Sequence, residues 1–357
     1  MVGAAIKGAG AIRPDVRTGY SQAIVAVLAL QYRGKRTGKA GVMTTISSVI
    51  DFHCHHVPEK FALTTAQNFP RNQRARWEQT NRLLSDESLL LREVDSGDLA
   101  ARVVNIPAAL VADADGVVPH DIIRAMNDHM ADLAVRHGGK VLALATIDAY
   151  DGERAGKEVE RAAGELGLKG IFVDAGRGDR LIDAPEARPA LEMAAKLGVP
   201  VFVHPVNPQP MTARMVPYGR IGTLFARGTI NAQALIALVE GGVFESLPDL
   251  RVVVTALAYG GLAVAAEFDD HSKSGDSAIA VMRKHVAIDT MGFSAPLVRA
   301  AADLLGVENV MCGSDWPILN EEPLTPVLSK ILAEAGFSAQ EQEMIASGNA
   351  RRLLGVA

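Results

Sequence analysis

Cysteine is scarce in this chain of 357 residues, which holds only Cys54 and Cys312. Both lie in strand-like apolar segments far apart in the sequence, so we expect no disulfide framework and a reducing compartment, the cytoplasm. Long apolar runs are missing as well, because none reaches the roughly 18 residues that a membrane-spanning helix needs. A basic excess is also missing, since 41 acidic residues outnumber 36 Lys and Arg. The sequence therefore gives no sign of a membrane or nucleic-acid partner.

The first 42 residues differ in charge from the rest of the chain. They carry one acidic residue, Asp15, against seven basic ones: Lys7, Arg13, Arg17, Arg33, Lys35, Arg36 and Lys39. Their one apolar run, residues 23–30, is followed by basic residues rather than by a small-residue cleavage site. We interpret residues 1–42 as a disordered extension or a start codon placed too early, with a targeting segment as the weaker alternative. Residues 43–357 are then expected to form one domain.

From residue 48 onward, short runs rich in Val and Ile alternate with helical stretches, the pattern of βα units around a parallel sheet. Eight segments have strand character: residues 48–55, 101–108, 141–148, 168–175, 200–205, 251–258, 286–292 and 309–317. Eight units over about 300 residues favour a single (β/α)8 TIM barrel over a doubly wound sheet. The long segment after the first strand, residues 59–98, is predicted to be an irregular insert over the barrel mouth.

This insert carries a group of arginines beside Trp77: Arg71, Arg74, Arg76 and Arg82. A run of charges is usually a solvated helix face. The alternative is a clamp for an anionic substrate, in which Arg74 is the candidate binding residue.

Three histidines in four residues close the first predicted strand, within "IDFHCHHVP". Side chains at i and i+2 of a strand share a face, so His53 and His55 project together while Cys54 and His56 point the other way. His56 packs against neighbouring residues or contacts substrate through the insert. A lone pair of this kind is only modest evidence for a metal site.

The ends of two later strands strengthen the metal hypothesis. His204 ends the fifth predicted strand and Asp315 the eighth, and barrels gather functional residues at the C-terminal ends of their strands. Taken singly, His204 could be a structural histidine and Asp315 could cap a turn. Three imidazoles and one carboxylate together suit a divalent transition metal, with zinc as the default and manganese, iron or cobalt as alternatives.

Seven motifs follow in order between about residues 49 and 354: "IDFHCHHVP", "LKGIFV", "VFVHP", "LPDLRVVV", "AIDTMG", "CGSDWP" and "SGNARRLLG". Together they resemble the amidohydrolase superfamily, in the branch of aminocarboxymuconate-semialdehyde decarboxylase and related aromatic-acid decarboxylases. The resemblance implies one metal ion held by His53, His55, His204 and Asp315, with Asp315 also moving protons. It also implies a homodimer.

The chain departs from the family pattern after the sixth strand, where a histidine is expected and the sequence reads "VVVTALAYGGLAV". Depending on the alignment, Ala256, Ala258 or Tyr259 takes its place. Tyr259 can donate a hydrogen bond to substrate, but with an ordinary pKa near 10 it is a poor base at neutral pH. The missing histidine also disfavours a binuclear site.

Three functions fit these residues. The leading hypothesis is a hydrolase of a small amide, cyclic imide or lactone, in which Asp315 shuttles the proton of a metal-activated water. The first alternative is a non-oxidative decarboxylase of a hydroxylated aromatic or muconate-like acid. The second is a barrel that has lost turnover and acts as a binding protein. In the first two cases the partner is a small molecule, expected to carry a carboxylate.

Overall fold

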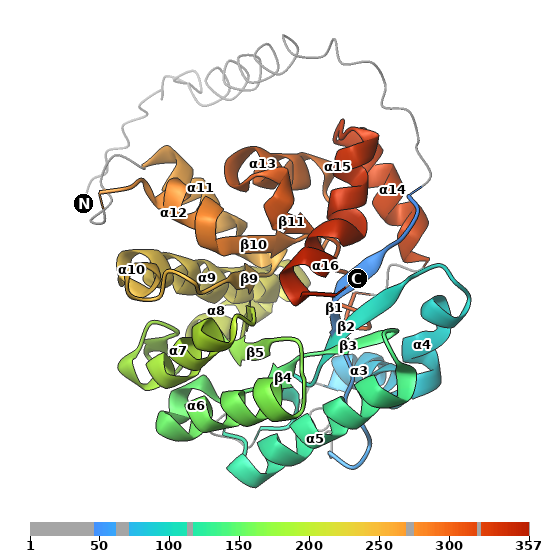
Figure 1. Ribbon diagram of the computed structural model, residues 1–357, viewed down its shortest axis with the longest axis vertical. Coiled ribbons are helices and arrows are strands. Elements are labelled where there is room, and N and C mark those ends of the chain that lie inside the picture. Colours follow the sequence, from blue (N-terminus) through green and yellow to red (C-terminus); the bar gives the residue numbers. More distant parts are fainter. Residues whose placement is uncertain (1–45, 62–70, 113–116, 269–274, 320–322, 357) are drawn as a thin grey trace, which may run out of the picture. The chain divides into compact units, whose positions relative to one another are not determined.

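The computed structural model describes residues 46–61, 71–112, 117–268, 275–319 and 323–356, without the side chains of residues 71–74. The predicted extension, residues 1–42, lies outside the described residues, so its interpretation stays a prediction. Parallel strands form two ladders surrounded by helices (Figure 1). The first ladder contains β1 (Ile50–His55), β2 (Ala101–Asn105) and β3 (Val141–Ala143). The second contains β4 (Ala145–Thr146), β5 (Ile171–Asp174), β8 (Val201–His204), β9 (Val252–Val254), β10 (Val286–Asp289) and β11 (Val310–Met311).

Backbone hydrogen bonds join the two ladders at both seams. Only Leu144 separates β3 from β4, and its N–H donates to the carbonyl of Val104 in β2 at 2.9 Å. At the other seam, the N–H of Phe52 in β1 donates to the carbonyl of Cys312 at 2.8 Å. With β3 and β4 counted as one strand, the eight predicted strands form a ring, and the predicted TIM barrel is confirmed.

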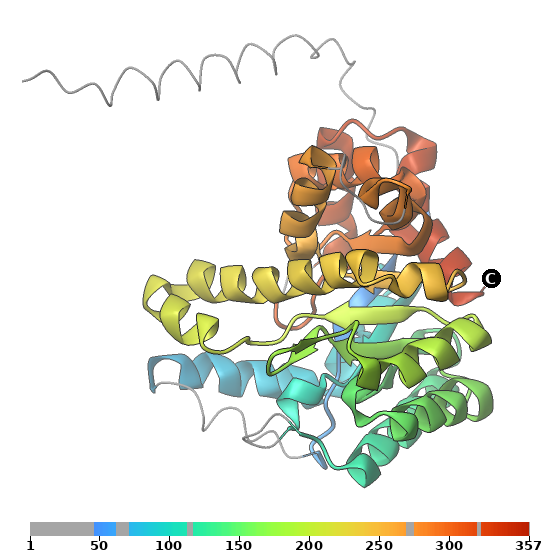
Figure 2. The ribbon, with the colours of Figure 1, turned by 90° about the vertical axis from the view of Figure 1, so that its left-hand side faces the viewer.

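Helices alternate with the strands along the chain and cover the outside of the ring (Figures 1 and 2). They are α3 (Arg71–Ser85), α4 (Glu87–Asp95), α5 (His120–His137), α6 (Glu153–Val159), α7 (Arg188–Leu197), α8 (Met211–Met215), α9 (Gly219–Glu240), α10 (Val243–Ser246), α11 (Tyr259–Glu267), α12 (Ala278–His285), α13 (Ala295–Leu305), α14 (Leu324–Glu334), α15 (Ala339–Glu343) and α16 (Asn349–Leu354). The predicted insert is therefore helical rather than irregular in its described part, where α3 and α4 occupy most of it. No helix in the described ranges is long and apolar enough to cross a membrane.

Both faces of the strands are apolar, which explains their near-continuous Val and Ile content. Outward-facing residues such as Val203 and Ile288 pack with the helices in the main core. Inward-facing residues, among them Phe172 and Phe202, form a separate cluster inside the barrel. The rings of these two phenylalanines contact edge to face, with centroids 5.5 Å apart. The barrel is therefore a packed core below its mouth.

Above the apolar layer, at the C-terminal ends of the strands, the inward-facing side chains are polar. In five strands, a polar residue stands two positions after an apolar inward-facing residue and therefore also faces inward. These polar residues are Asn105, Asp174, His204, Thr255 and Asp289. In β1 the register with β2 shifts between Asp51 and Cys54. The rings of both Phe52 and His53 consequently face Phe202, at centroid distances of 5.8 and 4.9 Å. This bulge lets β1 supply His53 and His55 to the mouth directly above its apolar residues.

The polar layer leaves no room for a side chain at Gly313. A Cβ there would lie 2.8 Å from the Cβ of Asp289 and 2.9 Å from the Cβ of His53. We expect Gly313→Ala to lower the free energy of unfolding by about 1–3 kcal/mol, because β10 and β1 must move apart. Urea unfolding of Gly164→Ala is the matched control, since no atom lies within 4 Å of the added methyl group. Equal stability of Gly313→Ala and wild type would contradict this packing.

Candidate metal centre

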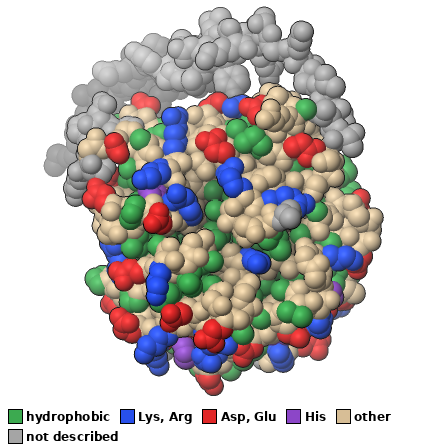
Figure 3. Space-filling model, viewed as in Figure 1, with side chains coloured by type: hydrophobic (Ala, Val, Ile, Leu, Met, Phe, Trp, Pro, Cys, Tyr) green, Lys and Arg blue, Asp and Glu red, His purple; other side chains and the backbone are tan. Residues whose placement is uncertain are grey.

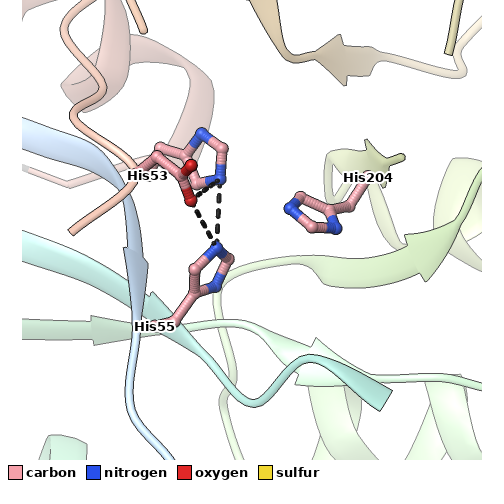
Figure 4. Close-up of side chains that lie close together, drawn as sticks. His53, His55 and His204 are labelled. Atoms are coloured by element: carbon pink, nitrogen blue, oxygen red, sulfur yellow. Dashed lines mark hydrogen bonds and ion pairs between the residues drawn. The ribbon is translucent and has the colours of Figure 1, made fainter. Parts of the chain in front are cut away.

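The four predicted ligands meet at the mouth of the barrel. Each of His53, His55, His204 and Asp315 offers one ligand atom, and these atoms lie within 4.8 Å of one another. Figure 4 shows His53 and His55 close together, with His204 facing them from the other side. The structure thus brings together residues that are up to 262 positions apart, since 315 − 53 = 262.

The spacing of these atoms fits a bound ion. The Nε2 atoms of His53 and His55 lie 3.2 Å apart. The Oδ1 atom of Asp315 lies 3.1 Å from Nε2 of His55 and 3.4 Å from Nε2 of His53. Two ligand atoms that are each about 2.1 Å from a tetrahedral ion lie about 3.4 Å apart. The donor set and its spacing therefore suit one divalent transition metal.

Two hydrogen bonds orient the imidazoles of β1. Nδ1 of His53 lies 2.7 Å from Oδ2 of Asp289, and Nδ1 of His55 lies 2.9 Å from Oδ1 of Asn105. Asn105 donates its own Nδ2 to the carbonyl of Cys54 at 3.2 Å, which fixes the orientation of its amide. Because both partner oxygens are acceptors, each Nδ1 carries the proton and each Nε2 lone pair faces the centre.

Burial and nearby charges shift the pKa values of three of the four side chains in the direction that favours the protonation state a metal ligand needs. Burial lowers the pKa of His204 well below its ordinary value, and the charge of Arg227 lowers it further. Burial also lowers the pKa of His55. For Asp315 burial acts in the opposite direction, but His53 and His55 outweigh it and lower the pKa. The exception is His53, whose pKa is raised because Asp315 and Asp289 outweigh the effect of burial.

The backbone holds Asp315 in an uncommon conformation. Its φ of 62° lies in the left-handed region, which a non-glycine residue adopts at a cost. Its N–H donates to the carbonyl of His53 at 2.8 Å. The preceding Ser314 donates its hydroxyl to Asp51 Oδ2 at 2.6 Å and its N–H to Oδ1 at 2.9 Å. The buried carboxylate of Asp51 thus fastens the segment after β11 onto β1.

Three of these supporting residues were not predicted. Asn105 and Asp289 each end a strand, so the strand-end rule that identified His204 and Asp315 would also have found them. Asp51 has a weaker signal, a carboxylate within an apolar strand, which is costly to bury without partners.

The three residues predicted to bind substrate differ in their surroundings. His56 points away from the centre, and its ring stacks on that of His129 at a centroid distance of 6.0 Å. Burial lowers its pKa to about 4. Tyr259 opens α11, and its buried hydroxyl has no hydrogen-bond partner among the described residues. Burial raises its pKa. Arg74 belongs to α3, but its side chain lies outside the described residues. Their roles in substrate binding stay predictions.

A family comparison matches nearly all of this barrel. The family model described as Amidohydrolase covers residues 50–356. The chain belongs to the amidohydrolase family. The predicted resemblance is therefore confirmed.

Similar proteins within this family are decarboxylases. The chain is 24% identical to 2-amino-3-carboxymuconate-6-semialdehyde decarboxylase of Dictyostelium discoideum, over 76% of this chain and 77% of that protein. It is 27% identical to gamma-resorcylate decarboxylase of Rhodococcus jostii (strain RHA1), over 67% of this chain and 79% of that protein. Its fold resembles a crystal structure of a dihydroxybenzoic acid decarboxylase from Polaromonas sp. JS666 with bound manganese and the inhibitor 2-nitroresorcinol. The TM-score is 0.76 at 21% identity, over 87% of this chain and 97% of that one.

These relatives contradict the leading functional prediction. We expected a hydrolase of an amide, imide or lactone, whereas the similar proteins release carbon dioxide. The prediction was wrong because the same metal ligands serve both reactions, so the ligand set carries no information on which bond is broken. The relatives do support the prediction that this chain is an enzyme.

Removal of a ligand tests the centre. We expect the wild-type protein to bind about one equivalent of a divalent metal, and His53→Ala and His204→Ala to retain about a tenth of it or less. Elemental analysis after dialysis measures this content. His120→Ala is the control, because that side chain is partly exposed and forms its ion pair with Asp151, outside the proposed site. Full metal content in both ligand variants would refute the site.

The residue behind His53 provides a second test. Asp289→Asn keeps the shape of the side chain but removes the charge that orients the imidazole. We expect metal affinity to fall by about 10–100-fold, as measured by competition with a chelator. The control is Asp303→Asn, a change at an exposed partner of Arg299. Unchanged affinity in Asp289→Asn would show that His53 needs no orienting carboxylate.

Proposed function

We propose that this chain is a metal-dependent, non-oxidative decarboxylase of a hydroxylated aromatic acid. The observation that carries the proposal is the family alignment with two kinds of decarboxylase over two thirds or more of each chain. The assembled set of three imidazoles and one carboxylate supports it, since that set provides the metal site the reaction uses. Manganese is the proposed metal because the similar Polaromonas structure contains it, with zinc as the alternative.

The ion would be held by His53, His55, His204 and Asp315, where it would polarise the carboxylate and hydroxyl oxygens of the substrate. Asn105 and Asp289 keep the two imidazoles of β1 in place. The apolar layer beneath, with Phe172 and Phe202, closes the floor of the site against water.

Asp315 is the proposed proton carrier. The family's histidine after the sixth strand is absent, and the N–H of Ala256 there is bonded to Asp289 at 2.8 Å. Asp315 accepts the proton of the substrate hydroxyl and delivers it to the ring carbon that bears the carboxylate. The carbon–carbon bond then breaks, and its electron pair restores the aromatic ring. Carbon dioxide leaves, and the phenolate oxygen takes a proton from solvent.

The remaining predictions from the sequence concern the partners, the oligomeric state and the location of the protein. The face shown in Figure 3 mixes acidic, basic and apolar side chains. The homodimer, the cytoplasmic location and the absence of a nucleic-acid partner stay predictions.

Two substrate panels test the function. We expect the manganese-loaded protein to release carbon dioxide from at least one ortho-hydroxybenzoate and to leave esters, lactones and cyclic imides intact. Asp315→Asn should lower the decarboxylation rate by about 100-fold or more, because the proton carrier is lost. Asp303→Asn is the matched control on the surface. Hydrolysis without release of gas would overturn the proposal.

A further inference from the structure

Arg227 is a charged residue on the face of α9 that packs against the barrel. One helical turn later on the same face, Asn231 is fixed by two hydrogen bonds. Its Nδ2 donates to the carbonyl of Val203, next to the ligand His204, at 3.2 Å. Its Oδ1 accepts from the hydroxyl of Thr255 at 2.8 Å. Arg227 therefore lies about 6 Å along the helix from a residue that is anchored at the ends of β8 and β9.

The helix that carries Arg227 is held close to the barrel. Ala226, Ile230 and Ala234 on this side of α9 are buried. A Cβ at the neighbouring Gly228 would lie 3.0 Å from the carbonyl oxygen of Leu257, so the two backbones nearly touch. In Figure 2, α9 is the long yellow helix. A side chain on such a rigid element is well suited to bind a ligand in a fixed position.

Arg227 has no direct partner among the described residues, either as a hydrogen bond or as an ion pair. Its guanidinium is close enough to the carboxyl groups of Asp315 and Asp174 to interact with both electrostatically. Burial lowers the pKa of Arg227, while Asp315 and Asp174 raise it. A partly buried guanidinium without a partner is costly, which indicates that an anion completes this site.

Asp174 lies on the same side of the centre. It pairs in register with His204 between β5 and β8, and it follows the inward-facing Phe172 by two residues. Its side chain therefore shares the barrel interior with His204. Burial raises its pKa to about 6. Neither a hydrogen bond nor an ion pair occupies its carboxyl group among the described residues.

We propose that Arg227 binds a second carboxylate of the substrate, one that stays on the ring after decarboxylation. This inference rests on the proposed function and narrows its substrate to an aromatic dicarboxylate. The departing carboxylate is a poor partner for Arg227, because it loses its charge as carbon dioxide forms and binding it would stabilise the ground state. A permanent carboxylate can accept two hydrogen bonds from a guanidinium throughout the reaction. Asp174 opposes the second carboxylate, so it limits how tightly the site binds.

Binding measurements test this inference without turnover. The probes are salicylate and its three derivatives with an extra carboxylate at ring position 3, 4 or 5, titrated calorimetrically into the manganese-loaded full chain. We expect at least one dicarboxylate to bind about tenfold or more tightly than salicylate. Arg227→Gln should abolish that advantage and leave the affinity for salicylate within about twofold. Arg227→Lys should restore part of it.

Asp174→Asn gives an effect of opposite sign, because it removes the competing charge. We expect it to tighten binding of the same dicarboxylate by a few-fold. Metal content and melting temperature of each variant show whether the protein remains folded and loaded. The inference is overturned if no dicarboxylate binds more tightly than salicylate, or if Arg227→Gln weakens all four probes equally. If the dicarboxylate binds through Arg227 but no carbon dioxide appears from any probe, the proposed reaction fails while the anion site stands.

Discussion

The metal centre depends on the attachment of the last strand segment to the first strand. Asp51 accepts hydrogen bonds from the hydroxyl and N–H of Ser314, and the N–H of Asp315 donates to the carbonyl of His53. These bonds close the barrel at the point where its first and last strands meet. They also hold Asp315 in a left-handed conformation that places its carboxylate against His55. Without this attachment, the Nε2 atoms of His53 and His55 would have no carboxylate beside them.

The polar residues around the centre form two groups. In the first group, Asp289 and Asn105 fix the imidazoles of β1, so two of the proposed ligands are oriented before any ion binds. In the second group, Asp174 pairs in register with His204 and interacts electrostatically with Arg227, and neither side chain has a hydrogen bond or ion pair among the described residues. The first group suits the binding of a cation. In the second group Arg227 suits the recognition of an anionic substrate, and Asp174 opposes it. The site therefore combines side chains that already have hydrogen-bond partners with side chains that have none among the described residues.

Most of the fold, and the meeting of four side chains at the barrel mouth, could be predicted from the sequence, because strand alternation and strand ends are local signals. His204 and Asp315 were found by that rule, and Asn105 and Asp289 obey it too. The bulge in β1 could not be predicted, because it depends on how β1 pairs with β2. Arg227 could not be placed either: its importance comes from the packing of α9 over the ends of β8 and β9. The reaction itself was predicted wrongly, because identical ligands support hydrolysis and decarboxylation.

The most direct measurement is the anomalous scattering of a crystal of the manganese-loaded protein, recorded near the manganese absorption edge. We expect one strong peak at the barrel mouth. It should lie about 2.0–2.3 Å from the ligand nitrogens of His53, His55 and His204 and from a carboxylate oxygen of Asp315. A peak at another set of residues, or none in protein that retains manganese, would show that these four residues do not hold the ion.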